Sequence, residues 1–596
     1  MRLDSSGYLA GDNGKRFIPV GANYWPGSCG VEMWREWPED EILADLELMA
    51  SLGFNTVRFF VRWPDFEPRP GTYDATAFAR LRRFLEACAE RGLRPQPSLF
   101  VGWMSGGVFW PEWKAGRNLF SDALMLERAT AYARTVSERL KPFAGRLCGV
   151  DMGNELNALP ESSSAKPAEV RAWCRAVAAT VRQILPGVPI LSGCDHQQIT
   201  ADTGWRLGDD TQPGVDIFTV HGYPVPGWHP VPLRGLGDPL TASLLPFYVK
   251  CVRAFGPVML QEFGTILGSP AAAPRAEAYL RAMLPACRDA GANGYLWWCF
   301  RDISARTHPY VKNPFETELG LVDAEGRVKE GLRPFIEFAR TVNSETSPDA
   351  PVPPGGDTAL YFPAHYYDRD EPENPGNRPA ETTRRLLVAH YLLERGGVSP
   401  GIVRGGGPIP PGIRRLVVAG AALDSREVEA FHLWVERDGG HLLWHGPDPQ
   451  GWASATTHLV GAAISDLGSA TPVETRFFDR VFRFPCHPRD TRVTVAPREA
   501  TVLLRDETGR PLLLHRRLGA GAVTCALPDV EAGVLRQWPD GEQDDAWVLW
   551  YSRLLATGRN PMPSEFATIG PVSEVTTLQS SRNPCASPVS PCAVMA

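Results

Sequence analysis

The chain has 596 residues, of which 43% are hydrophobic and 22% are charged, and its formal net charge is -7. This length exceeds what one compact core supports, so we expect at least two domains, one of them large enough to be a barrel. No basic stripe is present, which argues against a nucleic-acid partner, and no apolar run has the length of a signal-peptide core or a membrane span. We therefore expect a cytoplasmic protein without nucleic-acid or membrane partners.

The cysteines and tryptophans narrow the class of protein further. The 12 cysteines are scattered without CxxC pairs, which indicates reduced, buried thiols in place of a disulfide framework or a zinc site. The 18 tryptophans belong to an aromatic content of 10%. They fit either large hydrophobic cores or a sugar-binding protein, because the apolar faces of sugars stack on indole rings.

Between residue 17 and about residue 340, short apolar runs alternate with amphipathic stretches, which is the pattern of repeated β-α units. Eight apolar runs are candidate strands, at 17–25, 56–61, 94–103, 147–155, 189–196, 217–224, 257–264 and 294–300. Helices are predicted at 39–53, 74–92, 126–145, 167–185, 244–256, 276–291 and 330–342. Eight strands that are each followed by a helix or a long loop match a (β/α)8 TIM barrel better than a doubly wound sheet.

A second domain is predicted after a linker rich in Pro, Gly and Ser. The expected division is a barrel domain at 1–345, a linker at 346–358, a second domain at 359–560 and a disordered tail at 561–596. In the second domain we expect strands at 359–367, 414–420 and 441–446 and a helix at 425–440. Hairpins are expected at 500–528 and a closing helix at 544–558. The predicted fold class is therefore α/β, a TIM barrel followed by a smaller α/β domain with β-hairpins.

The active site of a TIM barrel lies at the carboxyl ends of its strands. The predicted strands end near the candidate site residues Trp25, Arg58, Trp103, Asn154, Glu155, His221, Tyr223, Glu262 and Trp298. Two carboxylates in an aromatic-lined cleft are what glycoside hydrolysis requires, because one protonates the leaving oxygen while the other attacks, or activates water, on the opposite face of the sugar. Each residue alone has a structural explanation, as a helix cap or a core side chain. Their joint placement on one barrel face favours catalysis.

The motifs GNEL, QEFG, TVRFF, VHGYP and GYLWW stand at these strand ends, and with them residues 17–345 resemble the clan A glycoside hydrolases, in particular family 5. The resemblance implies a retaining double displacement, with Glu155 as acid/base and Glu262 as nucleophile, about 5 to 5.5 Å apart. It implies a covalent glycosyl-enzyme, with no metal and no cofactor. The resemblance implies that Asn154 contacts the sugar 2-hydroxyl, that Arg58 and Tyr223 support Glu262, that His221 lies near the acid/base and that Trp298 stacks under the sugar. Trp25 and Trp103 are further candidate sugar contacts because they stand at strand ends.

The second domain is similar to flavodoxin-like domains and to the amidotransferase-like trimerisation domain of some clan A β-galactosidases. The strand in RRLVVAGAALDS is followed by Ala and Leu where such a domain would need a nucleophilic cysteine, so we expect no second catalytic site. A homo-oligomer formed through this domain is the expected assembly.

The expected substrate is an oligosaccharide or another β-glycoside. An exo-acting β-mannosidase on short oligosaccharides is the first hypothesis, based on the family resemblance and on the expected cytoplasmic location. The alternatives are a β-galactosidase, a β-glucosidase and an endo-β-mannanase. A non-catalytic sugar-binding protein ranks below them, because both glutamates are present.

Overall fold

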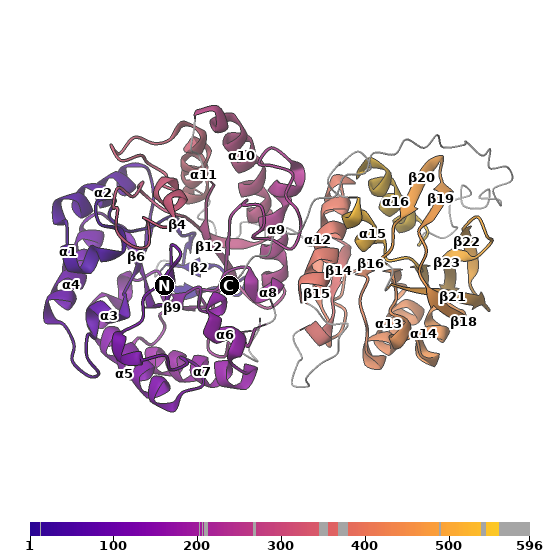
Figure 1. The fold of residues 1–596 in the computed structure, drawn as a ribbon, viewed down its shortest axis with the longest axis horizontal. Coiled ribbons are helices and arrows are strands. Elements are labelled where there is room, and N and C mark those ends of the chain that lie inside the picture. Colours follow the sequence, from indigo (N-terminus) through magenta and orange to yellow (C-terminus); the bar gives the residue numbers. More distant parts are fainter. Residues whose placement is uncertain are drawn as a thin grey trace, which may run out of the picture.

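The computed structural model describes residues 1–11, 14–201, 203–205, 207, 212–265, 270–344, 356–366, 379–487, 490–537 and 544–558. Figure 1 shows two units side by side, a ring of helices around a barrel and a smaller layered unit. The expected tail at 561–596 and residues 346–355 of the expected linker lie outside the described residues. Among the helices described, none is long and apolar enough to cross a lipid bilayer.

The first unit is a barrel of eight parallel strands. They are β4 (Val20–Asn23), β5 (Thr56–Phe60), β6 (Arg94–Val101), β9 (Val150–Asn154), β10 (Ile190–Leu191), β11 (Phe218–Gly222), β12 (Val258–Phe263) and β13 (Ala292–Trp297). Each strand pairs with the next, β13 pairs with β4, and a bridge between Leu191 and Ile217 joins β10 to β11 and closes the ring. The TIM barrel and all eight predicted strands are confirmed. These strands are buried on both faces, which is why they are nearly continuous apolar runs in the sequence.

The helices that cover the barrel include every predicted one. They are α2 (Glu39–Ser51), α4 (Ala75–Glu90), α5 (Ala123–Leu140), α7 (Pro167–Ile184), α9 (Pro239–Arg253), α10 (Ala273–Asp289) and α11 (Arg333–Ser344). Helices α4 and α5 begin directly after Asp74 and Asp122, whose side chains accept hydrogen bonds from backbone N–H groups in the first turn of each helix. Among the described residues between β10 and β11, the one helix is the short α8 (Gln197–Thr200).

The second unit is built on a seven-stranded sheet. Its strands are β14 (Thr358–Phe362), β15 (Gly401–Arg404), β16 (Arg415–Ala419), β17 (His441–His445), β22 (Thr501–Arg505), β23 (Pro511–Leu518) and β24 (Gly521–Ala526). Its order is β15-β14-β16-β17-β24-β23-β22, and the first five strands are parallel. The parallel strands thus follow the order 2-1-3-4-5 of flavodoxin-like folds, while the hairpin of β22 and β23 adds an antiparallel edge. The predicted α/β domain with hairpins is confirmed.

Helices and two further hairpin-like pairs complete this unit. The helices are α12 (Pro379–Arg395), α13 (Ser425–Asp438), α14 (Ser454–Val460), α15 (Val530–Arg536) and α16 (Asp544–Ala556). The additional strand pairs are β18 (Ala462–Ser469) with β21 (Thr491–Pro497) and β19 (Val473–Phe477) with β20 (Arg480–Phe484). Helix α12 lies between the sheet and the barrel (Figure 1).

The two units are joined by ion pairs as well as by packing of α12 on the barrel. Arg234, in the loop after β11, donates to Asp544 Oδ2 at 2.8 Å and to the Tyr391 hydroxyl at 3.0 Å. Lys250 of α9 donates to Glu394 of α12 at 2.7 Å. The second unit therefore holds the loop that follows β11, and this loop extends to the barrel mouth.

Gly21 on β4 is a position where the barrel tolerates no side chain. A Cβ atom there would lie 1.7 Å from the carbonyl oxygen of Thr56 on β5. We expect Gly21→Ala to lower the free energy of unfolding by about 3 kcal/mol or more, because the two strands would have to separate. Urea denaturation followed by circular dichroism measures this change. Gly145→Ala is the control, since nothing lies within 4 Å of its added Cβ, and equal stability of the two variants would contradict the steric argument.

Candidate active site

A pocket of about 640 Å³ opens at the carboxyl ends of the barrel strands, which is a usual size for a small-molecule site. Seven of the nine predicted site residues line it, namely Trp103, Asn154, Glu155, His221, Tyr223, Glu262 and Trp298. The carboxyl ends of parallel strands meet at one edge, so residues far apart in the sequence converge there.

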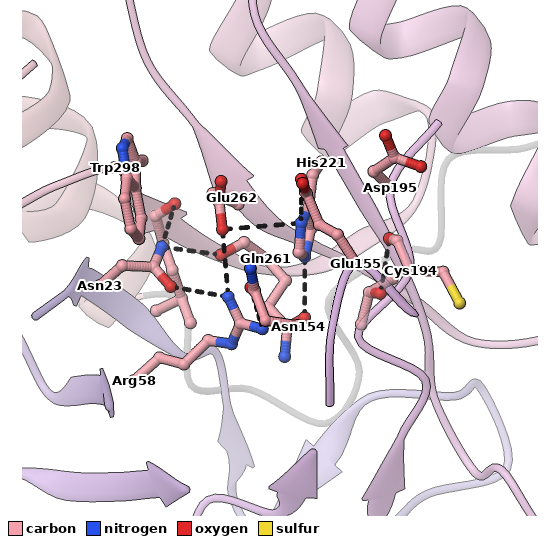
Figure 2. Close-up of polar contacts among 12 residues, drawn as sticks. Asn23, Arg58, Asn154, Glu155, Cys194, Asp195, His221, Gln261, Glu262 and Trp298 are labelled. Carbon is pink, nitrogen blue, oxygen red and sulfur yellow. Dashed lines mark hydrogen bonds and ion pairs between the residues drawn. The ribbon is translucent and has the colours of Figure 1, made fainter. Parts of the chain in front are cut away.

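Arg58 on β5 is completely buried beneath this pocket and organises its floor (Figure 2). Its Nη1 donates to Glu262 Oε2 at 3.1 Å and to Asn23 Oδ1 at 3.0 Å. Its Nη2 donates to Asp151 Oδ2 at 2.6 Å and to Asn154 Oδ1 at 2.9 Å, and its Nε also donates to Asp151, at 2.9 Å. One guanidinium therefore fixes the directions of Glu262 and Asn154 at the same time.

Glu262 lies on β12 and is held on both of its carboxylate oxygens. The hydroxyl of Tyr223 donates to Oε1 at 2.5 Å, while Arg58 donates to Oε2. Burial and the neighbouring Glu155 raise the pKa of Glu262, and Arg58 and the Tyr223 hydrogen bond oppose this rise without cancelling it. Burial also raises the pKa of Tyr223 well above its usual value, so the phenol keeps its proton and remains a donor. These donors favour the ionised carboxylate that a nucleophile needs.

Glu155 directly follows β9 and has a different environment. Its φ is 50°, in the left-handed region, and its N–H donates to the carbonyl oxygen of Gly193 at 2.8 Å. Gly193 must be glycine, since a Cβ would lie 1.7 Å from the carbonyl oxygen of Gly153. Burial and then the negative charge of Asp195 raise the pKa of Glu155 to about 8. At neutral pH this carboxyl therefore carries a proton, as a general acid requires.

The two glutamates lie close together. One oxygen of each carboxylate and a ring nitrogen of His221 all lie within 4.8 Å of one another. This separation is near the 5 to 5.5 Å typical of retaining glycosidases and well below the 6.5 to 9.5 Å of inverting ones. The same three side chains are the one group within the described residues whose ligand atoms could hold a metal ion, but the Arg58 cation beside Glu262 opposes a second cation there.

His221 connects the acid to the polar interior of the barrel. Burial lowers the pKa of His221, so its ring is neutral at pH 7 and only one nitrogen carries a proton. Nε2 lies 3.0 Å from Gln261 Oε1, and the Gln261 amide nitrogen donates to Gln96 Oε1 at 2.9 Å. With this orientation of the amide, the proton is on Nε2. Nδ1 is then an acceptor, 3.0 Å from Glu155 Oε1, and it faces a protonated Glu155.

Trp298 and Asp195 lie on opposite sides of the two glutamates in Figure 2. Trp298 is next to Glu262, where a stacked sugar would place its anomeric carbon, and its indole N–H donates to Glu316 at 3.2 Å. Asp195 lies beyond Glu155, on the side where a leaving group would receive its proton. The site thus has a glycone side and a leaving-group side.

Trp25 does not line the pocket, although it was predicted to contact the sugar. It is only 1% exposed. Its ring stacks on Phe60 at 5.1 Å, and its indole N–H points to Met104 Sδ at 3.3 Å. The strand β4 ends at Asn23, two residues earlier, so Trp25 supports the wall from outside. Arg58 also lies outside the pocket lining, beneath Glu262.

Several site residues were not predicted from the sequence. Asp151 is inside the apolar run of β9, where nothing marks it as the partner of Arg58. Asp195 stands near the end of the fifth strand, so the rule that selected the other strand ends could have found it. Glu316 lies in η6 (Pro314–Glu318), on a loop with no periodic pattern. Gln261 directly precedes Glu262 in the sequence, and no pattern there marks it as a separate site residue.

An exo-β-1,4-mannosidase from Opitutaceae bacterium strain TAV5 is similar to this chain over almost its whole length. The two are 60% identical, and the match covers 93% of this chain and 99% of the other, with a TM-score of 0.89. The chain belongs to the clan A glycoside hydrolases. Within the clan, a subfamily 18 member of family 5 from Streptomyces cattleya, in complex with Manβ1-4GlcNAc, is 25% identical and covers 65% of this hydrolase and 94% of its own chain, with a TM-score of 0.56.

Relatives from other glycosidase families share parts of the fold or sequence with this hydrolase. A family 42 β-galactosidase from G. stearothermophilus is 14% identical and covers 89% of this chain and 88% of its own, with a TM-score of 0.64, which shows a shared fold across both units. The model of glycosyl hydrolases family 35 matches residues 16–154. A β-galactosidase from Xanthomonas manihotis is 27% identical over 24% of this chain, and the β-galactosidase-1-like protein of Mus musculus is 30% identical over 24%. The match spans only 26% and 23% of these two relatives.

The negative charge of Asp195 raises the pKa of Glu155, so removing this charge lowers that pKa. We expect Asp195→Asn to move the alkaline limb of the pH profile of kcat/KM to lower pH, because Glu155 then loses its proton earlier. The measurement is the pH dependence of hydrolysis of an aryl β-glycoside. Asp289→Asn is the control, because Asp289 is exposed at the far end of α10. An unmoved limb in Asp195→Asn would show that Asp195 does not set the acid.

Proposed function

We propose that this hydrolase is an exo-acting, retaining β-mannosidase that releases terminal β-linked mannose from short oligosaccharides. The observation that carries the mechanism is the pair of close carboxyl groups in unlike environments. Glu262 is held by an arginine and a tyrosine, whereas Glu155 is buried beside a second acid and keeps its proton. This difference supports Glu262 as the nucleophile and Glu155 as the acid.

In the first step the Glu262 carboxylate attacks the anomeric carbon as the bond from that carbon to the glycosidic oxygen breaks. The proton of Glu155 moves to that oxygen, so the leaving group departs neutral and a covalent glycosyl-enzyme remains. In the second step the Glu155 carboxylate accepts a proton from water, and the water oxygen attacks the anomeric carbon. Glu262 leaves as a carboxylate, and the sugar is released with its original configuration.

The choice of mannose is supported by the relatives that match this chain over most of their length. The 60% identical enzyme is described as an exo-β-1,4-mannosidase, and the family 5 relative from Streptomyces cattleya holds Manβ1-4GlcNAc. The curated β-galactosidases match only about a quarter of this chain. β-galactosidase activity is therefore the second candidate, ahead of β-glucosidase and endo-β-mannanase.

Exo action is supported by loops that close the glycone side of the pocket. The hairpin of β7 (Trp103–Met104) and β8 (Gly107–Val108) meets the loop after β13, where Asn313 Nδ2 donates to the carbonyl oxygen of Ser105 at 2.9 Å. Above it, Phe315 contacts Trp228 edge to face, with ring centroids 5.7 Å apart. A closed end favours a substrate that enters by its terminus.

The second domain is proposed to mediate homo-oligomerisation, and the cytoplasmic location stays a prediction. Three exposed large apolar side chains, Leu433, Leu467 and Val481, lie on this domain, and exposed apolar groups favour association. We expect light scattering of the full chain to give a multiple of the 65.4 kDa chain mass. A mass of one chain would contradict the proposal.

The sugar and the site are tested together with p-nitrophenyl β-glycosides. We expect the wild-type protein to hydrolyse the β-mannoside with a higher kcat/KM than the β-galactoside and the β-glucoside. Glu262→Ala should abolish turnover, because no covalent intermediate can form. Glu155→Ala should lower kcat/KM by roughly 10²- to 10⁴-fold, as for loss of a general acid.

Two controls separate the sugar from the mechanism. Glu112→Ala changes an exposed glutamate outside the pocket and should keep wild-type rates. Added azide should restore activity to Glu155→Ala with release of a β-glycosyl azide, because the anion attacks the anomeric carbon of the glycosyl-enzyme directly, displaces Glu262 and needs no general base. Unchanged hydrolysis in Glu262→Ala would contradict the nucleophile, and a preferred galactoside would contradict the sugar.

A further inference from the structure

A third glutamate of the pocket has no part in the double displacement. Glu316 lines the pocket from η6, and its Oε2 accepts the indole N–H of Trp298 at 3.2 Å. Within the described residues no arginine, lysine or histidine forms an ion pair with it. Holding the indole ring requires only one oxygen of this carboxyl group. The second oxygen is an additional strong hydrogen-bond acceptor in the site.

The wall around Glu316 offers a second polar group that lacks a partner. Ser105 in the turn between β7 and β8 is 7% exposed and has φ 52°. Its hydroxyl makes no hydrogen bond of ordinary geometry within the described residues. It lies close to Glu316, whose pKa burial raises to about 7 against the smaller opposing effects of Trp298 and Ser105. Buried polar groups are normally paired, so an unpaired hydroxyl that lines the same pocket indicates a ligand at this wall.

The position of this wall identifies the part of the sugar that would reach it. A sugar that reacts has its anomeric carbon between Glu262 and Glu155, and its ring lies along Trp298. Trp298 lies on the side of Glu262 away from Asp195 and the leaving group (Figure 2), and its indole N–H points to Glu316. In a six-membered pyranose ring, C4 is the atom across from the anomeric carbon. The hydroxyl on C4 is therefore the group directed at the far wall.

The geometry points to Glu316 as the residue that binds the 4-hydroxyl of the terminal sugar and thereby selects chain ends. This inference rests on the proposed exo-β-glycosidase function and deepens it. In a β-1,4-linked chain only the terminal residue has a free 4-hydroxyl, which donates its hydrogen to the Glu316 carboxylate. In an internal residue that oxygen carries the next sugar, has no hydrogen to donate, and would push that sugar against the contact between Ser105 and Asn313.

A substrate and enzyme cycle tests this contact. The probes are the p-nitrophenyl β-glycoside that the wild-type protein cleaves best and its 4-deoxy and 2-deoxy analogues. We expect the 4-deoxy analogue to lose about 10- to 100-fold in kcat/KM with the wild-type protein when the pH is above the Glu316 pKa of about 7, the range for a hydrogen bond to a charged group. Glu316→Ala and Glu316→Gln should lose a similar factor with the parent substrate, and the further loss with the 4-deoxy analogue should be less than about threefold.

Matched controls separate binding from positioning of Trp298. Glu318 lies in the same 3-10 helix but does not line the pocket. The Glu318→Gln variant should therefore lose the same factor in kcat/KM on 4-deoxygenation as the wild-type protein. The loss on 2-deoxygenation should be the same in the wild-type protein and in the Glu316 variants, because the 2-hydroxyl lies at Asn154. If the Glu316 variants lose as large a factor on 4-deoxygenation as the wild-type protein does, the two losses are independent. Glu316 then only positions the indole ring, and the inference is overturned.

The inference stays testable if the variants fold poorly. Wild-type protein that cleaves the 4-deoxy analogue as fast as the parent substrate would overturn it without any variant. Its failure is also distinct from failure of the proposed sugar, because the cycle uses whichever glycoside the protein prefers. Preference for a galactoside would reject the mannosidase proposal and leave the test of Glu316 intact.

Discussion

The contact of Arg58 with Glu262, and not with Glu155, is the interaction on which the site depends. A fully buried guanidinium is stable only when carboxylates and amide oxygens satisfy its donors, and here Asp151, Glu262, Asn23 and Asn154 do so. The cation stabilises the ionised form of Glu262. Glu155 accepts no hydrogen bond from Arg58. Burial and the negative charge of Asp195 outweigh the opposing effect of the Arg58 charge on its pKa, so its proton is retained. One arginine thus gives two like side chains different environments, as the proposed roles of nucleophile and acid require.

The barrel provides the distances that this division needs. Glu155, the proposed acid, follows β9, and Glu262, the proposed nucleophile, lies on β12. The two lie on opposite parts of the ring, yet their oxygens come within 4.8 Å of one another. The left-handed backbone of Glu155, fixed by Gly193, turns its carboxyl into the pocket. On the rim, Arg234 ties the loop after β11 to the second domain, so this domain supports a loop that carries Tyr223 at its start.

The strands and the placement of Glu155 and Glu262 in one pocket were predictable because both follow from local patterns. Strands buried on two faces are apolar runs, and in a barrel whatever polar residue ends such a run faces the site. The remaining contacts depend on side-chain direction and on loops. Asp151 is hidden in an apolar run, and Arg58, its partner, is on another strand. Trp25 follows its strand by two residues and turns away from the pocket, while Glu316 lies on a loop whose path no periodicity fixes.

The charges of the completed site also constrain the substrate. Glu155, Glu262, Asp195 and Glu316 line the pocket, and Arg58 beneath it is already shared with Asp151. Glu155 is protonated at neutral pH, but the ionised groups among the others disfavour anionic sugars and favour neutral ones, whose hydroxyls donate to carboxylates. The positive charge that develops at the anomeric carbon in the oxocarbenium-like transition state is stabilised by the ionised Glu262 beside it. The acidic side chains therefore contribute to both binding and catalysis. Discrimination among neutral sugars depends on where individual hydrogen-bond acceptors lie along the pocket wall.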